Sequence, residues 1–137
     1  MSTPVILEHR THLPLHHRVL PLLAVAAATP LVHLRPHRLR KTLELVRRGA
    51  RPATAAQAHA ARTAVVSVNL RCSGQDCLRR SVATALLCRA RGTWPTWCTG
   101  VRTHPFAAHA WIEAQGHPVG EPANTASFHT LLTVPPR

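Results

Sequence analysis

The sequence predicts an α+β fold with its helices first and its strands after them. Before Gly92, apolar residues recur at helical spacing between recognisable start and end signals. After Gly92, residues 97–102 and 108–114 have the composition of strands. A chain of 137 residues holds one main hydrophobic core. We therefore expect a basic helical segment over residues 1–50 and a folded domain over residues 51–137.

Four helices are expected, and three of them have a clear start signal. The segments are 15–28, 36–48, 54–69 and 77–91. Pro36 suits a first helical turn, where its missing N–H costs no hydrogen bond. Thr54 and Gln57 have the spacing of a capping box. Asp76 can cap the helix that begins at Cys77.

Loops and strands complete the expected order. Residues 1–14 should form a flexible start, and residues 70–76 should form a loop. A turn at Gly116 should lead to a returning strand at Val119, and residues 131–134 should form a last short strand.

The composition makes the chain strongly basic, with 17 Lys and Arg against 5 Asp and Glu and a net charge of +12. Such a surface suits nucleic acid. However, residues 1–70, the more basic half, contain no Phe, Tyr or Trp on which bases could stack. Arg in place of Lys on a solvated surface is the favoured explanation of the charge, and attraction to an acidic partner is a third option. We expect no nucleic acid among the partners.

The four cysteines, Cys72, Cys77, Cys88 and Cys98, are too few for a disulfide scaffold in a chain of this length. They lack paired C-x2-C spacing, so no metal site is expected. The longest uncharged run, residues 19–34, has 16 positions and is shorter than the ~20 that a membrane-spanning helix needs. We expect a cytoplasmic protein with reduced thiols and no stable membrane association.

Cys77 is the candidate nucleophile. It follows a loop and lies in the first turn of an expected helix, with Arg79 and Arg80 nearby. Unpaired N–H groups and the positive end of the helix dipole favour a thiolate there, and the same N–H groups can stabilise an oxyanion. A buried cysteine that merely begins a helix would give the same pattern, so the assignment requires a base.

A histidine downstream would be that base, and the candidates are His104, His109, His117 and His129. His109 lies in an apolar expected strand, and its small neighbours leave room for a substrate. His104 and His117 border loops, where solvated surface roles suit them. A core histidine bonded to a carbonyl is the alternative interpretation of His109.

The third group should be a carboxylate, and after residue 70 the only acids are Asp76, Glu113 and Glu121. Glu113 is four residues from His109 along a strand, or ~13 Å away. A three-residue hairpin loop with Gly116 in the left-handed conformation would place Glu121 opposite His109. A two-residue turn would put Glu121 on the other face. The glycine position favours the three-residue loop, so Glu121 is the expected orienting group.

The segments around these residues resemble a known enzyme family. Residues 77–92, 94–102 and 105–113 are similar to the stand-alone transglutaminase-like leader peptidases of lasso-peptide biosynthesis, and the resemblance covers residues 45–137. It implies a transglutaminase-like, papain-like cysteine peptidase core with N-terminal helices.

The resemblance also implies a function and roles for the site. Cys77 corresponds to the nucleophile, His109 to the general base, and Glu121 to a third residue that is usually Asp in the family. The implied activity removes the leader segment from a ribosomally made precursor without a cofactor. The implied partners are the precursor peptide, a separate leader-recognition protein and a lasso cyclase.

Two other functions fit the sequence. One is a non-catalytic basic adaptor protein that binds acidic partners, and the other is a transglutaminase-type acyltransferase that uses the same three residues. We also expect the helices over residues 15–48 to dock a partner, because Leu39, Leu43 and Val46 form an apolar face in a segment that need not join the catalytic core.

Overall fold

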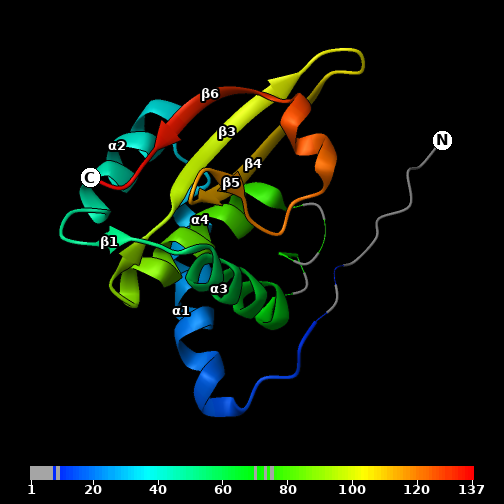
Figure 1. Cartoon of the computed structure of the whole chain (residues 1–137). Helices are drawn as coiled ribbons and strands as arrows, with labels where there is room; N and C mark the ends of the chain where they lie inside the picture. The colour runs from blue at the N-terminus through cyan, green and yellow to red at the C-terminus, as the bar shows by residue number, and fades with distance from the viewer. Residues whose placement is uncertain (1–7, 9, 70, 73, 75) are drawn as a thin grey trace.

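The computed structural model describes residue 8 and residues 10–69, 71–72, 74 and 76–137 (Figure 1). This part of the chain contains four α-helices: α1 (Leu15–Leu31), α2 (Pro36–Val46), α3 (Ala55–Val68) and α4 (Cys77–Ala90). Much of the predicted flexible start, and three positions of the predicted loop at 70–76, lie outside the described residues. Arg71, Cys72 and Gly74 within that loop are in turn conformation.

The strands form one antiparallel sheet and one short parallel pair. The sheet has the order β5-β4-β3-β6. Its strands are β3 (Thr96–Arg102), β4 (Ala107–Ala114), β5 (His117–Pro118) and β6 (His129–Val134). The parallel pair joins β1 (Arg51–Pro52) to β2 (Thr93–Trp94), and a 3-10 turn, η1 (Ala123–Ser127), precedes β6. All four helices precede the strands of the antiparallel sheet, which confirms the predicted α+β class, although the short strand β1 lies between α2 and α3.

Helix α4 is the centre of the molecule. It packs against α1 and α3 on one side and against β4 on the other, as Figure 1 shows. Because α4 is covered on several sides, more of its residues are buried than those of the single apolar stripe that the sequence predicts. Trp94 and Trp97, both fully buried, close the core between α4 and the sheet. Their indole N–H groups donate to the Val134 carbonyl and the Ser81 hydroxyl, each at 3.0 Å.

Two of the three predicted helix start signals are confirmed, and the predicted cap by the Asp76 side chain is wrong. Pro36 occupies the first turn of α2. The Thr54 hydroxyl accepts from the Gln57 N–H, and the Gln57 side chain accepts from the Thr54 N–H, so the predicted capping box is confirmed. Asp76 occupies the N-cap position of α4, but its side chain makes no capping hydrogen bond. That carboxylate instead pairs with Arg79 at 3.0 Å.

The N-terminal helices differ from the prediction in their packing. Leu39 and Leu43 are 3% and 0% exposed and belong to the same hydrophobic core as α3, α4 and the sheet. The expectation that this apolar face of α2 stays free for a partner is therefore wrong. It failed because the apolar face of a helix has the same sequence pattern whether its own domain or a partner covers it.

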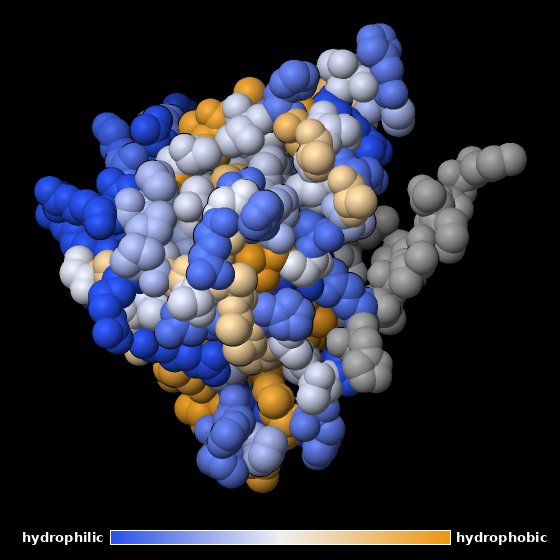
Figure 2. Space-filling model, in the orientation of Figure 1, coloured by the Kyte–Doolittle hydropathy of each residue, from blue (hydrophilic) through white to orange (hydrophobic). Residues whose placement is uncertain are grey.

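The exposed apolar surface lies on α1 instead. Leu15, Val19, Leu22 and Leu23 are exposed, while Ala24, Val25 and Ala28 on the other side of the helix are buried. Apolar residues show as orange at the lower end of Figure 2, where α1 lies in Figure 1. Among the described residues, no helix, α1 included, is both long enough and apolar enough to cross a membrane.

Candidate active site

Cys77 is the first residue of α4, as predicted. The Arg80 N–H donates to the Asp76 carbonyl in the first turn, so the N–H groups of the preceding residues in that turn have no helical acceptor. The side chain is partly exposed at the mouth of a pocket. The positive end of the helix dipole thus lies at a thiol that reagents and substrates can reach.

His109 lies in the middle of β4, directly opposite Gly100 of β3. Because Gly100 has no side chain, the Trp111 ring and the His129 carbonyl pack closely against it, and an added Cβ would lie 2.9 and 2.5 Å from them. The imidazole ring stacks on Trp111, with ring centroids 5.8 Å apart. It also contacts Phe128, with ring centroids 5.4 Å apart. These two aromatic side chains limit the orientations that the imidazole can adopt, and neither was singled out as functional from the sequence.

Glu121 is the carboxylate at His109. Its Oε2 lies 2.8 Å from His109 Nε2, and its side chain is only 3% exposed. Because Nε2 is engaged by Glu121, Nδ1 is the ring nitrogen left to face Cys77. The predicted set of Cys77, His109 and Glu121 is thus brought together in one place.

The turn that leads to Glu121 is not the predicted one. Gln115 and Gly116 have φ values of 54° and 82° and form a two-residue turn, with Ala114 paired to His117. The predicted three-residue loop is therefore wrong. A hairpin continued in the observed register would put Glu121 on the face away from the imidazole.

Gly120 resolves this conflict. Strand pairing ends after Val119, whose N–H donates to the Ile112 carbonyl at 3.0 Å. Gly120 then adopts a φ of 66°, a left-handed conformation that glycine takes without strain. This change of direction lets Glu121 approach His109 although the hairpin register alone would not.

The electrostatics of the site favour a thiolate–imidazolium pair. Burial alone would raise the pKa of Cys77, but hydrogen bonds from His109 and from the Ala110 backbone, with the charges of His109 and Arg80, outweigh it and lower that pKa. Burial likewise opposes the charged form of His109, yet its hydrogen bonds with Cys77 and Glu121 raise the pKa of the imidazole to about 9. At neutral pH the imidazole is therefore protonated beside the sulfur.

A pocket of about 280 Å³ opens beside the pair. Cys77 and His109 line it together with mainly apolar groups from α2, α4, β3, β4 and β6. These groups include Leu39, Leu78, Trp97, Val101 and Leu132. A peptide side chain can be held there while its backbone carbonyl approaches the sulfur.

The other cysteines are in a different state. Cys72, Cys88 and Cys98 are free and buried. Desolvation raises the pKa of Cys72 and of Cys88 to about 11 and that of Cys98 to about 12. Among the described residues, no three His, Cys, Asp or Glu side chains gather into a group that could hold a metal ion.

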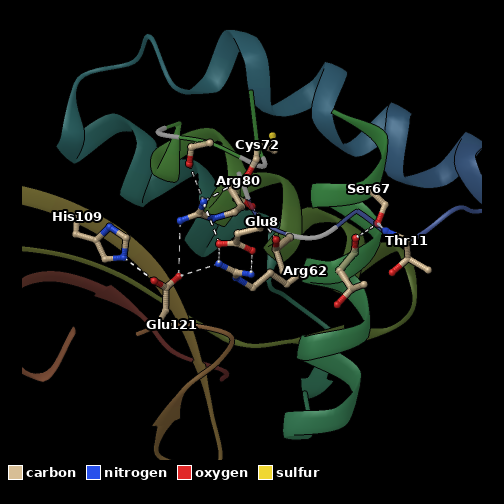
Figure 3. A network of polar contacts seen from close by, with 11 residues as sticks. Glu8, Thr11, Arg62, Ser67, Cys72, Arg80, His109 and Glu121 are labelled. Carbon is tan, nitrogen blue, oxygen red and sulfur yellow. Dashed lines mark hydrogen bonds and ion pairs between the residues drawn. The ribbon is translucent and has the colours of Figure 1, made fainter. Parts of the chain in front are cut away.

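Two buried arginines behind Glu121 complete the site. Arg62 of α3 and Arg80 of α4 lie 3.6 and 3.9 Å from Glu121 Oε1 (Figure 3). Sequence reasoning noted Arg80 only as a charge near Cys77 and missed Arg62. The scarcity of acids in so basic a chain was the available signal, because a buried, ionised carboxylate is stabilised by nearby cations.

Comparison with known proteins identifies the family of the chain. A family model described as the transglutaminase-like superfamily matches residues 21–133. The match begins within α1, so it includes most of the helical segment that packs into the core. No curated protein and no solved structure matches the chain. The family match spans most of the 137 residues, and the chain belongs to the transglutaminase-like superfamily.

Proposed function

We propose that this protein is a cytoplasmic cysteine peptidase that removes the leader segment from a lasso-peptide precursor. The observation that supports the chemistry is the coupled Cys77–His109 pair at the mouth of an apolar pocket, with Glu121 bonded to the far side of the imidazole. The sequence resemblance around these residues supports the choice of substrate. The proposed partners are the precursor, a separate leader-recognition protein and a lasso cyclase.

Each residue has one task in the proposed reaction. The Cys77 thiolate attacks the scissile carbonyl carbon, and the π electrons of the C=O bond move onto the oxygen. The Cys77 backbone N–H, at the positive end of α4, would stabilise that oxyanion. The oxyanion then collapses, the C–N bond breaks, and His109 gives its proton to the departing amine. The acyl group stays on Cys77 as a thioester.

Hydrolysis returns the enzyme to its starting state. His109, now neutral, accepts a proton from a water molecule as that water attacks the thioester carbonyl. The C–S bond breaks, the acid product leaves, and the thiolate and the imidazolium are restored. Glu121 keeps the imidazole oriented and stabilises its positive charge throughout, since it bonds Nε2 and leaves Nδ1 for both transfers.

Mass spectrometry of a precursor peptide incubated with the protein and its leader-recognition partner tests the proposal. We expect one cut that separates leader from core, with the two fragments together heavier than the precursor by one water. The variant Cys77→Ala should be inactive, because it lacks the attacking sulfur. The matched variant Cys98→Ala, which changes a buried free cysteine of β3, should still cut the precursor.

The same experiment distinguishes the acyltransferase. With a primary amine added in excess, a peptidase still gives the free acid, whereas an acyltransferase gives the amide. An intact precursor after incubation with the wild-type protein and its partner would contradict the leader-peptidase assignment. Cleavage by Cys77→Ala would contradict the role of the cysteine.

A further inference from the structure

The carboxylate of Glu8 lies behind the site, against the arginines that face Glu121. It forms a bidentate pair with Arg62, at 2.5 and 2.6 Å, and its Oε1 is 3.6 Å from Arg80. Figure 3 shows Glu8 and Glu121 on opposite sides of the two guanidinium groups. Two cations and two carboxylates thus form one cluster, and His109 is bonded to one end of it.

The two arginines are held as fixed elements of the fold. Their side chains are 8% and 7% exposed, so their charges need partners within the protein. Arg62 also packs on Gly120: a Cβ placed there would lie 2.8 Å from the Arg62 Cδ. The position of Arg62 is therefore coupled to the backbone bend that brings Glu121 to His109.

Arg80 connects the cluster to the nucleophile. One of its terminal nitrogens donates to the carbonyls of Cys72 and Gly74, at 3.3 and 3.2 Å, in the turn that precedes Cys77. Its other terminal nitrogen faces Glu121. A displacement of this guanidinium would therefore disturb both the segment before the thiol and the carboxylate that orients the imidazole.

The segment that carries Glu8 is attached to the same helix as Arg62. The Arg10 guanidinium donates to the Ser67 carbonyl at 3.0 Å. The Thr11 N–H donates to the Ser67 hydroxyl at 3.0 Å, as Figure 3 shows. Burial opposes the charge of Glu8, but Arg62 and Arg80 outweigh it and lower the pKa of this carboxyl. Glu8 is thus ionised at neutral pH.

We propose that Glu8 is a positioning residue of the active site, which holds Arg62 and Arg80 against Glu121 and balances their charge. Without it, two buried guanidinium groups would share the single carboxylate of Glu121. That carboxylate would then be drawn toward the arginines and away from the imidazole. The role rests on the proposed catalytic set, but it does not depend on which peptide is the substrate.

The charges around His109 determine the direction of the expected effect. Cys77 and Glu121 contact the ring directly, Arg62 and Arg80 lie behind Glu121, and Arg102 lies over the Phe128 ring that touches the imidazole. Removing the negative charge of Glu8 makes the site more positive. A more positive site favours the Cys77 thiolate and disfavours the His109 imidazolium. Both groups should therefore lose their proton at a lower pH.

The test compares Glu8→Gln with Glu44→Gln. Both carboxylates pair with an arginine, and their side chains are equally exposed, at 35% and 34%. Only Glu8 belongs to the active-site cluster. For each variant, the rate of Cys77 alkylation by iodoacetamide is measured against pH, with the modified peptide identified by mass spectrometry, alongside precursor cleavage and thermal melting.

We expect Glu8→Gln to lower the midpoint of Cys77 alkylation by about half a pH unit. It should reduce kcat for the precursor about tenfold, with KM little changed, because the reacting groups are misplaced while the binding pocket is intact. Glu44→Gln should match the wild type in each measurement. In Glu8→Ala, added acetate should restore the midpoint and kcat, and propanol should not.

Equal alkylation midpoints and equal kcat for Glu8→Gln and Glu44→Gln would overturn the inference. So would a kcat loss in Glu8→Ala that acetate leaves unchanged. The alkylation assay needs no precursor, so the two proposals can fail separately. If the wild-type protein leaves the precursor intact but Glu8→Gln still shifts the midpoint, the leader-peptidase function fails and the role of Glu8 stands.

Discussion

The two ends of helix α4 carry the same side chain in opposite states. Cys77 begins the helix, and the pKa of its thiol is lowered. Cys88, in the last turns of the same helix, is fully buried, and desolvation raises the pKa of its thiol to about 11. Burial opposes the thiolate at both positions.

The difference lies in what surrounds each sulfur. Cys77 has an imidazole, a backbone N–H and a guanidinium close by, as well as the positive end of the helix dipole. Cys88 has a hydrogen bond with Thr93 and the more weakly acting charge of Arg91, which do not offset its desolvation. A buried cysteine in this fold is therefore inert unless groups that stabilise its anion are built around it.

Replacing His109 should make the two ends of α4 alike and have the largest effect on activity. In His109→Asn the thiol loses both its hydrogen-bonding partner and a nearby positive charge, and the leaving amine loses its proton donor. We expect precursor cleavage to fall about 10³-fold. His117→Asn, at an exposed histidine of β5, should cleave at the wild-type rate, and an equal loss in both variants would contradict the assignment of His109.

A smaller effect is expected at Gly120, which places Glu121. An alanine there would be strained by the φ of 66°, and its Cβ would collide with the Arg62 side chain, which Glu8 and Glu121 hold in place. We expect a loss of roughly 2–3 kcal/mol in the free energy of unfolding. We also expect slower cleavage, because the bend that brings Glu121 to His109 is disturbed.

Gly116→Ala is the matched control for this variant. Its φ is also positive, at 82°, but no atom lies within 4 Å of an added Cβ. Gly116→Ala should lower the free energy of unfolding by only about 1 kcal/mol, because of the backbone conformation alone. It should leave activity unchanged. Urea unfolding monitored by tryptophan fluorescence measures both variants. Equal losses of stability and of activity would show that the contact with Arg62 does not matter.

Much of the fold follows from local signals that are visible in the sequence. The capping box at Thr54, the proline at the start of α2 and the cysteine at the start of α4 all lie where local chemistry predicts. Packing partners do not follow from such signals. The apolar face that includes Leu39 and Leu43 was predicted to be free, because a periodic pattern shows that a helix is amphipathic but not what covers it.

The sequence predicts three residues that the structure brings together, but it does not predict all of their geometry. The thiol at a helix start and the histidine in an apolar strand are local features, and the structure brings them together. Glu121 was chosen by hairpin register, yet the observed turn has the other register, and the bend at Gly120 compensates. Arg62 and Glu8 were missed because their contact joins residues 54 positions apart. No local pattern encodes such a contact.

His109 and the start of α4 lower the pKa of the Cys77 thiol. Iodoacetamide alkylation of all four cysteines across a pH series, with each modified peptide followed separately, measures this effect. We predict that Cys77 in the wild-type protein reacts with a midpoint below the ordinary thiol value of 9.0, and that His109→Asn raises this midpoint. Cys88 should react only after unfolding. A wild-type Cys77 midpoint at or above 9.0, or one that His109→Asn leaves unchanged, would show that these groups do not stabilise the thiolate.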